Sequence, residues 1–530
     1  MEKRKRVLII GLDGFTWRLG RGFMSEGFMP HLAQLAEGGC CGNLKSVIPP
    51  ETSPAWSSFQ TGCRPGKTGV FAFHTYDRNR NKVRLNSFGD IAAPSIWELA
   101  DRAGRKVVSL NMPVSSPPPK VDGIIIPGLL CPKLSTATVH PPSAYKKYIK
   151  PHKDYLIVNK DPKETAGEFT TQAIATERAR MRVAIELIKD IDWDIFCVQI
   201  QSSDALQHRL WWALDASARG YCDKNRAEAL TFYKFCDSAL GRLVEAAGPG
   251  AVTFVISDHG FCKLEYNLSI NVWLRKNGYL KLLDEPVDAW SRAKSRVKPL
   301  KSAAKLYGNI RKALQGAGNT PPYFQQDLVH IRRIIDLDNT KAFCLGGMGG
   351  IIYINGTPAE RADLSKKLAD ELSRDLGPGS STPVIDRIRP GVEVYPDATA
   401  VESLPDLVAE FAHGVVGVIY PLGSSAVQEA DFDGKQHGTH EPEGIIVMNG
   451  PGIKNNQKLN GDLVDIVPTI LAYFGIAVPR HIDGKVLSGA FVEPPRVNYV
   501  DLDFGGPSPA GYSDAEQTEV EKNLTDLGYL

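Results

Sequence analysis

The chain has 530 residues, and its 62 Lys and Arg residues against 60 Asp and Glu residues leave a formal net charge of +2. This near-neutral balance argues against sequence-specific or general nucleic-acid binding. The length exceeds the usual size of one domain, and a hydrophobic content of 43% is ordinary for a globular protein.

The N-terminal segment MEKRKRVLIIGLDGF begins like the basic region of a signal peptide, but its apolar run VLII is too short for export. No stretch of about 18 apolar residues follows, so we predict no transmembrane segment. The nine cysteines contain no CxxC pair, which argues against a disulfide framework, and Cys197 and Cys344 lie in apolar runs typical of buried thiols. A cytoplasmic location is expected.

Short β-branched runs alternate with helical patterns along the chain. The runs that indicate strands lie at 7–14, 106–113, 123–127, 195–200, 252–257, 350–355 and 444–450. Nearly continuous apolar strands are typical of a sheet buried on both faces, and the intervening helices indicate parallel crossovers. We therefore predict an α/β fold with a mixed, mostly parallel central sheet flanked by helices.

Two regions interrupt this alternation. The first turns basic and helical after 281, with eight Lys or Arg and no Asp or Glu between Arg292 and Lys312. The second, from about 356 to 430, is punctuated by Pro and Gly. We predict a core domain formed by 1–280 and 431–530, the latter including the C-terminal tail, and an inserted cap or substrate region at 281–430.

Within these regions two short patterns carry specific predictions. The basic stretch 292–312 indicates a solvated helix face, because Pro299 interrupts the pattern. The alternatives are a lid that grips an anionic group and a contact with an anionic membrane surface. In the tail, Ser513 and Glu516 fit a capping box, which predicts a helix that begins there.

Seven polar residues fall where a predicted strand ends or a predicted helix begins. In an open α/β sheet, active sites form at that edge. Carboxylates, a hydroxyl and imidazoles are suitable ligands for two divalent metal ions that share one site. The seven candidates are Asp13, Thr52, Asp204, His208, Asp258, His259 and His440.

Each candidate also has a simpler interpretation. Asp13 follows VLIIGL and Thr52 precedes a helix, so both are possible helix caps. Asp204 and His208 are four residues apart and share one helix face, where a surface hydrogen bond is the usual outcome. A lone His such as His440 before a strand is usually structural. The combination, together with the strand-end pair in VISDHGF, favours a metal site.

Together these motifs resemble the alkaline phosphatase superfamily, specifically its type I phosphodiesterase and nucleotide pyrophosphatase branch. The resemblance rests on the LDG start, the T-x-P element before a helix, the D-x-x-x-H pair, the SDHG strand end, the GTHEPEG segment and DLVDIVPTILAYFGIAVPRHIDGKVL at 462–487. It covers both ends of the chain and covers 281–430 poorly. It implies an alkaline-phosphatase-like sheet and a phosphate-ester substrate.

The resemblance also implies roles for the candidates. One metal ion would be bound by Asp13, Asp258 and His259 and would contact Thr52. The other would be bound by Asp204, His208 and His440. The family uses zinc most often and manganese in some members. Thr52 would attack phosphorus and form a phospho-threonine that water then cleaves.

Departures from the family pattern narrow the substrate. Sulfatases of this superfamily carry Cys or Ser at the nucleophile position and Arg four residues later. This chain has Thr52 and Trp56 at those positions, which argues against a sulfatase. Ala55 replaces the Asn of many nucleotide phosphodiesterases, so a nucleotide preference does not carry over. The nearest Arg to Thr52 is Arg64, twelve positions away, which favours a diester or a phosphonate over a monoester.

Two further predictions concern the surroundings of the site and the alternatives. Trp56 and Trp211 are candidates to line a leaving-group pocket, whereas packing in the core is the more common role of such residues. A phosphomutase or phosphotransferase resembling cofactor-independent phosphoglycerate mutase stays open, as does a non-catalytic metal-binding module. Thr52 argues against the module, which has no need of a nucleophile.

Overall fold

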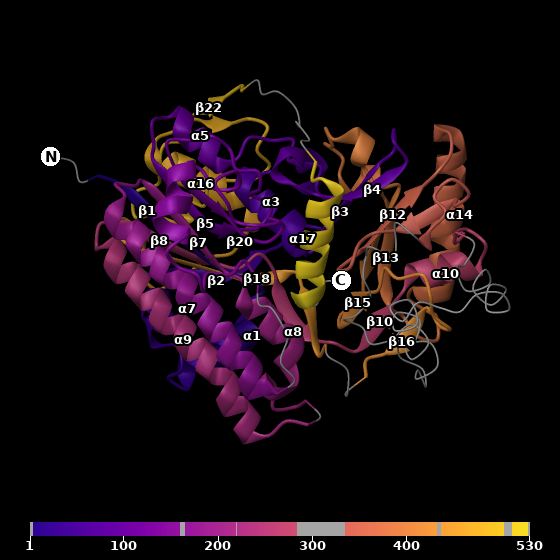
Figure 1. The fold of residues 1–530 in the computed structure, drawn as a ribbon, viewed down its shortest axis with the longest axis horizontal. Coiled ribbons are helices and arrows are strands. Elements are labelled where there is room, and N and C mark those ends of the chain that lie inside the picture. The colour runs from indigo at the N-terminus through magenta and orange to yellow at the C-terminus, as the bar shows by residue number, and fades with distance from the viewer. Residues whose placement is uncertain are drawn as a thin grey trace, which may run out of the picture.

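A computed structural model describes residues 4–158, 165–218, 220–283, 334–431, 436–502 and 511–527. The basic stretch 292–312 lies outside these residues. The described chain forms a larger α/β body and a smaller body built on an antiparallel sheet (Figure 1). No helix in the described part of the chain is long and apolar enough to cross a membrane. The cytoplasmic location stays a prediction.

The larger body is built on a nine-stranded sheet with the order β19-β2-β18-β8-β1-β7-β5-β6, in which β20 also pairs with β2. Neighbours from β8 to β6 run parallel, whereas β18 is antiparallel to both β8 and β2. The prediction of a mixed, mostly parallel sheet is confirmed. The strands are β1 (Arg6–Leu12), β2 (Cys40–Lys45), β5 (Val107–Met112), β6 (Gly123–Pro127), β7 (Ile195–Ile200), β8 (Ala251–Ile256), β18 (Glu443–Asn449), β19 (Gln457–Lys458) and β20 (Gly461–Asp462).

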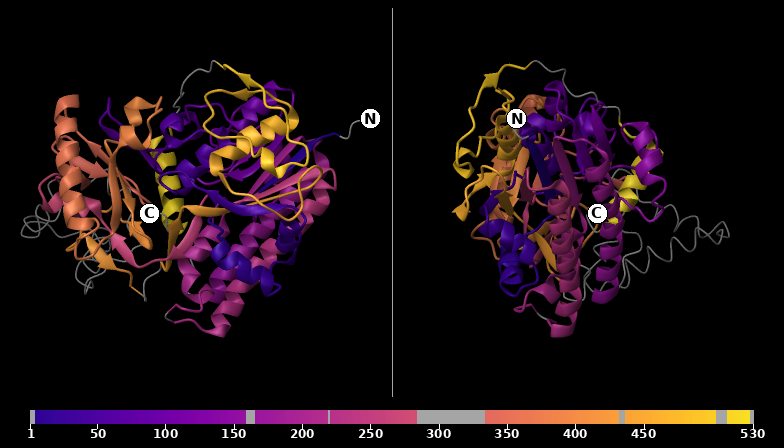
Figure 2. Two further views of the ribbon diagram at one scale, coloured as in Figure 1. Left: turned by 180° about the vertical axis from the view of Figure 1, so that it is seen from behind. Right: turned by 90° about the vertical axis from the view of Figure 1, so that its left-hand side faces the viewer.

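Helices cover both faces of this sheet, because side chains of a strand alternate between its two sides. In β1, Leu8 and Ile10 join one apolar cluster while Val7 and Ile9 join the other. The first face is covered by α1 (Trp17–Ser25), α2 (Pro30–Glu37), α7 (Ala166–Asp190), α8 (Ser202–Leu214) and α9 (Asp223–Ala247). The second is covered by α3 (Thr52–Thr61), α5 (Ile96–Arg102) and α16 (Ile466–Phe474) (Figure 2).

The smaller body contains a four-stranded antiparallel sheet with the order β11-β12-β14-β13. The apolar run predicted at 350–355 is β12 of this sheet, so its expected place in the central sheet is corrected. The sheet and its packing helices are β11 (Ala342–Cys344), β12 (Gly350–Ile354), β13 (Ile385–Pro390), β14 (Leu407–Phe411), α10 (Ile270–Lys276) and α14 (Pro358–Leu376).

β9 (Gly260–Lys263) and β17 (Gly438–Glu441) form a two-stranded antiparallel sheet, in which β9 contacts β18 of the central sheet and β17 contacts β15 (Val415–Gly417). The remaining elements are β3 (His74–Asp77), β4 (Lys82–Leu85), β10 (Tyr266–Leu268), β16 (Val427–Glu429), β21 (Val478–Pro479), β22 (Tyr499–Val500), α4 (Pro65–Thr68), α6 (Pro142–Ala144) and α15 (Gly391–Val394).

The C-terminal helix α17 (Asp514–Leu527) lies along the junction of the two bodies (Figures 1 and 2). Its start has the predicted capping box: the Ser513 N–H donates to Glu516 Oε2 at 2.9 Å, and the Glu516 N–H donates to Ser513 Oγ at 3.3 Å. The predicted division at 280 and 430 stays a prediction. The apolar cluster of the smaller body also includes residues of the first segment, among them Tyr76 and Trp273.

Candidate active site

The carboxyl ends of the parallel strands β1, β7 and β8 meet at one edge of the sheet, and the candidate ligands gather there. Asp13 directly follows β1, and Asp258 and His259 follow β8. Asp204 and His208 lie on α8, which begins just after β7, and His440 lies on β17. All of these side chains are buried. Residues separated by more than 400 positions in the sequence are thus brought together.

The first group contains Asp13, Asp258 and His259, whose ligand atoms lie close enough together to hold one ion. His259 Nε2 lies 3.7 Å from Asp13 Oδ1 and 3.2 Å from Asp258 Oδ2. These three residues are the set expected for one of the two metal ions.

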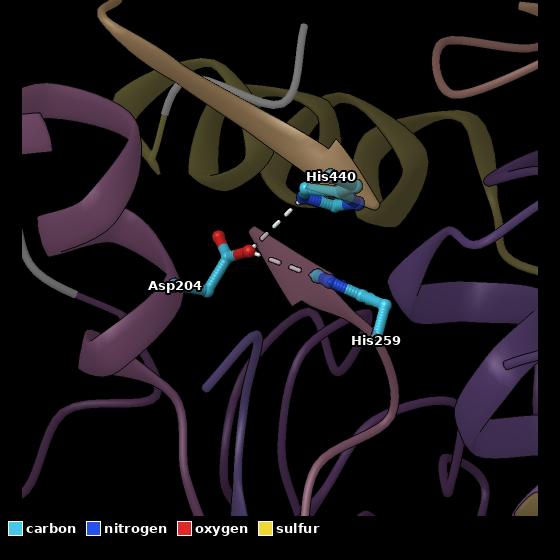
Figure 3. A group of neighbouring side chains, drawn as sticks. All are labelled: Asp204, His259 and His440. Atoms are coloured by element: carbon cyan, nitrogen blue, oxygen red, sulfur yellow. Dashed lines mark ion pairs between the residues drawn. The ribbon is translucent and has the colours of Figure 1, made fainter. Parts of the chain in front are cut away.

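The second group contains Asp204, His259 and His440. Figure 3 shows the Asp204 carboxylate pointing at the two rings, with Oδ1 at 3.1 Å from His440 Nε2 and 3.9 Å from His259 Nε2. His208 joins from the side, because its Nε2 lies 3.0 Å from His440 Nε2 and 3.5 Å from Asp204 Oδ2. His259 therefore lies between the two expected ligand sets.

Each of the three imidazoles directs its Nδ1 atom at a backbone carbonyl. Nδ1 lies 3.0 Å from the Gly438 carbonyl in His208, 2.9 Å from the Pro50 carbonyl in His440 and 3.2 Å from the Gly260 carbonyl in His259. A carbonyl oxygen only accepts, so these contacts assign the proton to Nδ1 in His440 and His259 and leave a lone pair on Nε2. Nδ1 of His208 also lies 2.9 Å from the Gln436 amide nitrogen, so its two contacts do not assign its proton. Nε2 of His208 and Nε2 of His440 lie 3.0 Å apart, so both could be ligands of one cation.

The carboxylates have the complementary feature. Among the residues that the structure describes, none is a hydrogen-bond partner for four buried oxygens: Asp13 Oδ1, Asp258 Oδ2 and both carboxylate oxygens of Asp204. Buried acceptors without a partner are costly and therefore rare in folded proteins. Burial raises the pKa of Asp13 and of Asp258 well above the usual value, and the neighbouring carboxylates raise both further.

The chemistry of this donor set fits divalent cations. Burial lowers the pKa of His208 to about 4 and that of His259 well below its usual value, so the imidazoles are neutral ligands near pH 7. Tetrahedral zinc with bonds of about 2.0–2.1 Å places its ligand atoms about 3.3 Å apart. The contacts within the two groups, from 3.1 to 3.9 Å, bracket that separation.

Thr52 is the first residue of α3, and the N-cap position is held by Glu51. The Thr52 hydroxyl is buried and has no hydrogen-bond partner among the described residues, so the alternative of a side-chain cap is wrong. Two residues earlier, the Pro50 carbonyl accepts from His440. The backbone that leads to Thr52 is therefore tied to a candidate metal ligand.

Supporting residues hold Asp13 in place. Asp13 Oδ2 accepts hydrogen bonds from Trp56 Nε1 at 2.8 Å and from Gln199 Nε2 at 2.5 Å. Asn111 Nδ2 donates to Gln199 Oε1 at 2.7 Å, which turns the Gln199 amide nitrogen toward Asp13. Gln199 and Asn111 were not among the predicted site residues. Their signal in the sequence is a polar residue inside a mostly apolar strand, β7 and β5 respectively.

Trp56 and Trp211 are both buried in the core, as the alternative interpretation had it. Trp56 donates to Asp13, and Trp211 donates to Asp215 at 3.2 Å while its ring stacks on Phe261. The observed role of Trp56 is to position a candidate ligand. Contact of either ring with a substrate stays a prediction.

A third group of potential ligands, Cys262, His413 and Glu441, lies beside β17. Arg18 Nη2 already contacts Glu441 Oε2 at 3.0 Å. Because the guanidinium neutralises this carboxylate, we assign no metal to the group.

The family model described as type I phosphodiesterase / nucleotide pyrophosphatase matches residues 7–337 of the chain. The chain belongs to this family. Membership assigns it to the phosphoester hydrolases, and the resemblance read from its motifs is confirmed. No curated protein sequence matches the chain.

Solved structures share the fold. Human ectonucleotide pyrophosphatase/phosphodiesterase 5 is 12% identical with a TM-score of 0.50, and the match covers 90% of this chain and 97% of that one. An inactive threonine-to-alanine variant of the murine protein, in complex with AMP, is 13% identical with a TM-score of 0.50 and coverage of 89% and 96%. Phosphonoacetate hydrolase from Sinorhizobium meliloti 1021, in complex with phosphonoformate, is 16% identical with a TM-score of 0.52 and coverage of 88% and 94%.

Proposed function

We propose that the protein is a metal-dependent phosphodiesterase that uses Thr52 as its nucleophile. The proposed cofactors are two divalent ions, which are zinc or, as the alternative, manganese. The observation that carries this proposal is the convergence of three imidazole Nε2 atoms on carboxylate oxygens that have no hydrogen-bond partner among the described residues. Such an arrangement is costly in a folded protein unless cations neutralise it.

The proposed assignment of ligands follows the two groups. Asp13, Asp258 and His259 would hold one ion, and Asp204, His208 and His440 the other. Bound divalent ions supply activation of a hydroxyl nucleophile and neutralisation of charge on the departing oxygen.

Thr52 supplies the attacking oxygen in this proposal. It begins α3, a helix of 10 residues, so the backbone N–H groups of the first turn and the positive end of the helix dipole lie beside it. Its Oγ forms a bond to phosphorus while the bond from phosphorus to the leaving alcohol breaks, and the alcohol departs with a proton. Water then cleaves the phospho-threonine and regenerates the hydroxyl. The inactive threonine-to-alanine variant of the murine structure supports a nucleophilic threonine.

The charges near Thr52 favour a substrate with one fewer negative charge than a monoester. Arg64, the nearest Arg after Thr52 in the sequence, donates to Asp462 Oδ2 at 2.6 Å and is half exposed. Its guanidinium is therefore engaged elsewhere and does not serve a monoester phosphate. A diester or a phosphonate is the proposed substrate class, and phosphonoacetate hydrolase shows that this fold hosts phosphonate chemistry in another protein.

Metal analysis and a substrate profile test the proposal. After reconstitution with zinc or manganese, the protein should bind two ions per chain and hydrolyse bis-p-nitrophenyl phosphate faster than p-nitrophenyl phosphate or p-nitrophenyl sulfate. A phosphonate ester is the fourth substrate of the profile. Fewer than one bound ion per chain, or a clear preference for the monoester, would contradict the proposal. Transfer of the phosphoryl group to an added alcohol in place of water would point to a phosphotransferase.

A further inference from the structure

The segment 48–52, which leads into α3, is held by both bodies of the protein. From the larger body, His440 Nδ1 donates to the Pro50 carbonyl at 2.9 Å. From the smaller body, the hydroxyl of Tyr395, which directly follows α15, donates to the Ile48 carbonyl at 2.8 Å. A stretch of five residues thus connects the nucleophile and a candidate metal ligand to the smaller sheet.

Glu51, directly before Thr52, makes the most extensive of these contacts. Its carboxylate is buried, and Oε1 accepts from the Phe73 N–H at 3.2 Å. Oε2 accepts from the N–H groups of Gly347 and Met348, each at 3.3 Å. These two amides belong to the loop 345–349, which joins β11 to β12. One carboxylate therefore joins the nucleophile's helix to a turn of the smaller sheet.

The glycines of this loop permit a close approach to the same segment. A Cβ added at Gly349 would lie 2.9 Å from the Pro49 Cβ, closer than real Cβ atoms tolerate. A Cβ added at Gly347 would meet nothing within 4 Å. Gly349 is thus required at the contact, whereas Gly347 is spatially free to carry a side chain.

We infer that Glu51 is a positioning residue, which fixes Thr52 for attack by clamping the segment 48–52 to the loop 345–349 of the smaller body. This inference rests on the proposed role of Thr52. A carboxylate that accepts three backbone N–H groups holds its own backbone rigidly, because charged acceptors form stronger hydrogen bonds than neutral ones. The smaller body then contributes to catalysis through the orientation of the nucleophile, without contacting the reacting atoms.

The test compares Glu51→Ala and Gly349→Ala with a matched control at saturating metal. Both variants should lower kcat for bis-p-nitrophenyl phosphate by about 100-fold, when kcat is calculated from the concentration of metal-loaded protein. A displacement of a reacting group by about 1 Å lowers a rate by that factor. KM should change by less than about threefold, because the substrate still binds. Glu51→Gln keeps one acceptor oxygen and should restore about tenfold of the lost rate.

A control outside the clamp separates positioning from general destabilisation. Glu98→Ala removes a carboxylate that accepts from Ser95 N–H at 2.9 Å at the start of α5, so it should lower the Tm and leave kcat unchanged.

The outcomes distinguish this inference from the proposed function. Wild-type kcat in Glu51→Ala, with Thr52→Ala inactive, would overturn the inference and leave the nucleophile in place. An equal loss of kcat in Glu98→Ala would assign the effect to stability and would also overturn it. Full activity of Thr52→Ala would instead reject the proposed function itself.

Discussion

The carboxyl edge of the central sheet and the four-stranded sheet of the smaller body are both buried, but they bury opposite kinds of side chain. At the first, the chain after β1 and β8 places buried carboxylates and imidazoles side by side, and several of the oxygens have no hydrogen-bond partner in the described part of the chain. At the second, β12 and β14 bury only apolar side chains in their central residues. Leu368, Leu372 and Leu376 of α14 cover them.

The difference shows where this protein gains stability and where it gives stability up. Burial of apolar surface stabilises the smaller body by roughly 25 cal/mol per Å². Burial of like-charged carboxylates without partners destabilises the sheet edge, as is common where a site is arranged for function. The contacts of Glu51 join the two regions, because its carboxylate precedes Thr52 and accepts from the loop 345–349 of the smaller body.

The largest expected effect is at Thr52. Thr52→Ala should lower kcat by about 10⁴-fold or more because the attacking oxygen is lost, while metal content and Tm stay close to those of the wild type. Thr52→Ser retains a hydroxyl and should keep part of the rate. Steady-state kinetics with metal analysis on the same samples measure this. Near wild-type turnover by the Ala variant would exclude covalent catalysis at this position.

Removal of a candidate metal ligand is expected to come next. His440→Ala should lower activity by about 100-fold or more and lower the bound metal to about one ion per chain, since His440 belongs to one proposed ligand set. Its Tm should change little, because the apolar clusters of the sheet do not depend on this ring. Chelation of both ions should abolish the activity of the wild type, and added zinc should restore it. Retention of full activity after chelation would contradict a metal-dependent reaction.

Loss of a supporting residue should have a smaller effect on activity. Gln199→Leu removes the amide that donates to Asp13 and should lower kcat by about 10- to 100-fold, the usual range for residues that orient a ligand. Gln60→Leu is the matched control, because Gln60 is equally buried but bonds to no candidate ligand. It donates to the backbone carbonyls of Pro113 and Trp56 and accepts from Trp97. That control should lower the Tm without lowering kcat. Equal losses of kcat in both variants would assign the effect to core packing.

The cost of the buried carboxylates can be measured in the metal-free protein. Asp258→Asn removes one charge while an amide oxygen can still accept from the Gly14 N–H, so it should raise the metal-free Tm by about 2–4 °C near pH 7.

The pH dependence follows from the direction of the pKa shift. Burial raises the pKa of Asp258 in the folded state above its unfolded value of about 3.9. The contribution of this carboxyl to the stability of the metal-free protein is therefore fully present below pH ~3.9 and is lost as the pH rises through the folded pKa. The advantage of the Asn variant should therefore be small at low pH and grow with pH. With metal bound, the order should reverse, because the carboxylate is then a ligand. A metal-free variant less stable than the wild type at neutral pH would contradict this account.

The smallest expected change lies in the smaller sheet. Ile352→Val removes one buried methylene and should lower the free energy of unfolding by about 1 kcal/mol. Its kcat should stay within about twofold of the wild type, since the loop 345–349 keeps its backbone. Thermal unfolding and kinetics on one sample measure both. A large loss of activity here would mean that the two regions are coupled through more than the clamp at Glu51.

The amino-acid sequence alone determined most of the central sheet and the set of candidate ligands. The apolar runs at 195–200 and 252–257 match β7 and β8 to within one residue, because buried parallel strands are apolar along their whole length. The spacing of Asp204 and His208 also determined that they share a helix face, since four residues make about one turn. Cys197 and Cys344 are buried, as their apolar neighbours predicted.

The tertiary structure decided what no local pattern contains. β2, with the sequence CCGNLK, lacks β-branched residues and is a strand because β18 pairs with it. The run at 350–354 has the same apolar character as β8 but pairs with β14, so strand pattern does not identify the sheet to which a strand belongs. The hydrogen bonds from Gln199 to Asp13 and from Gly347 and Met348 to Glu51 join residues 186, 296 and 297 positions apart. Periodicity reports the neighbours along an element, whereas contacts at such separations depend on how the elements pack.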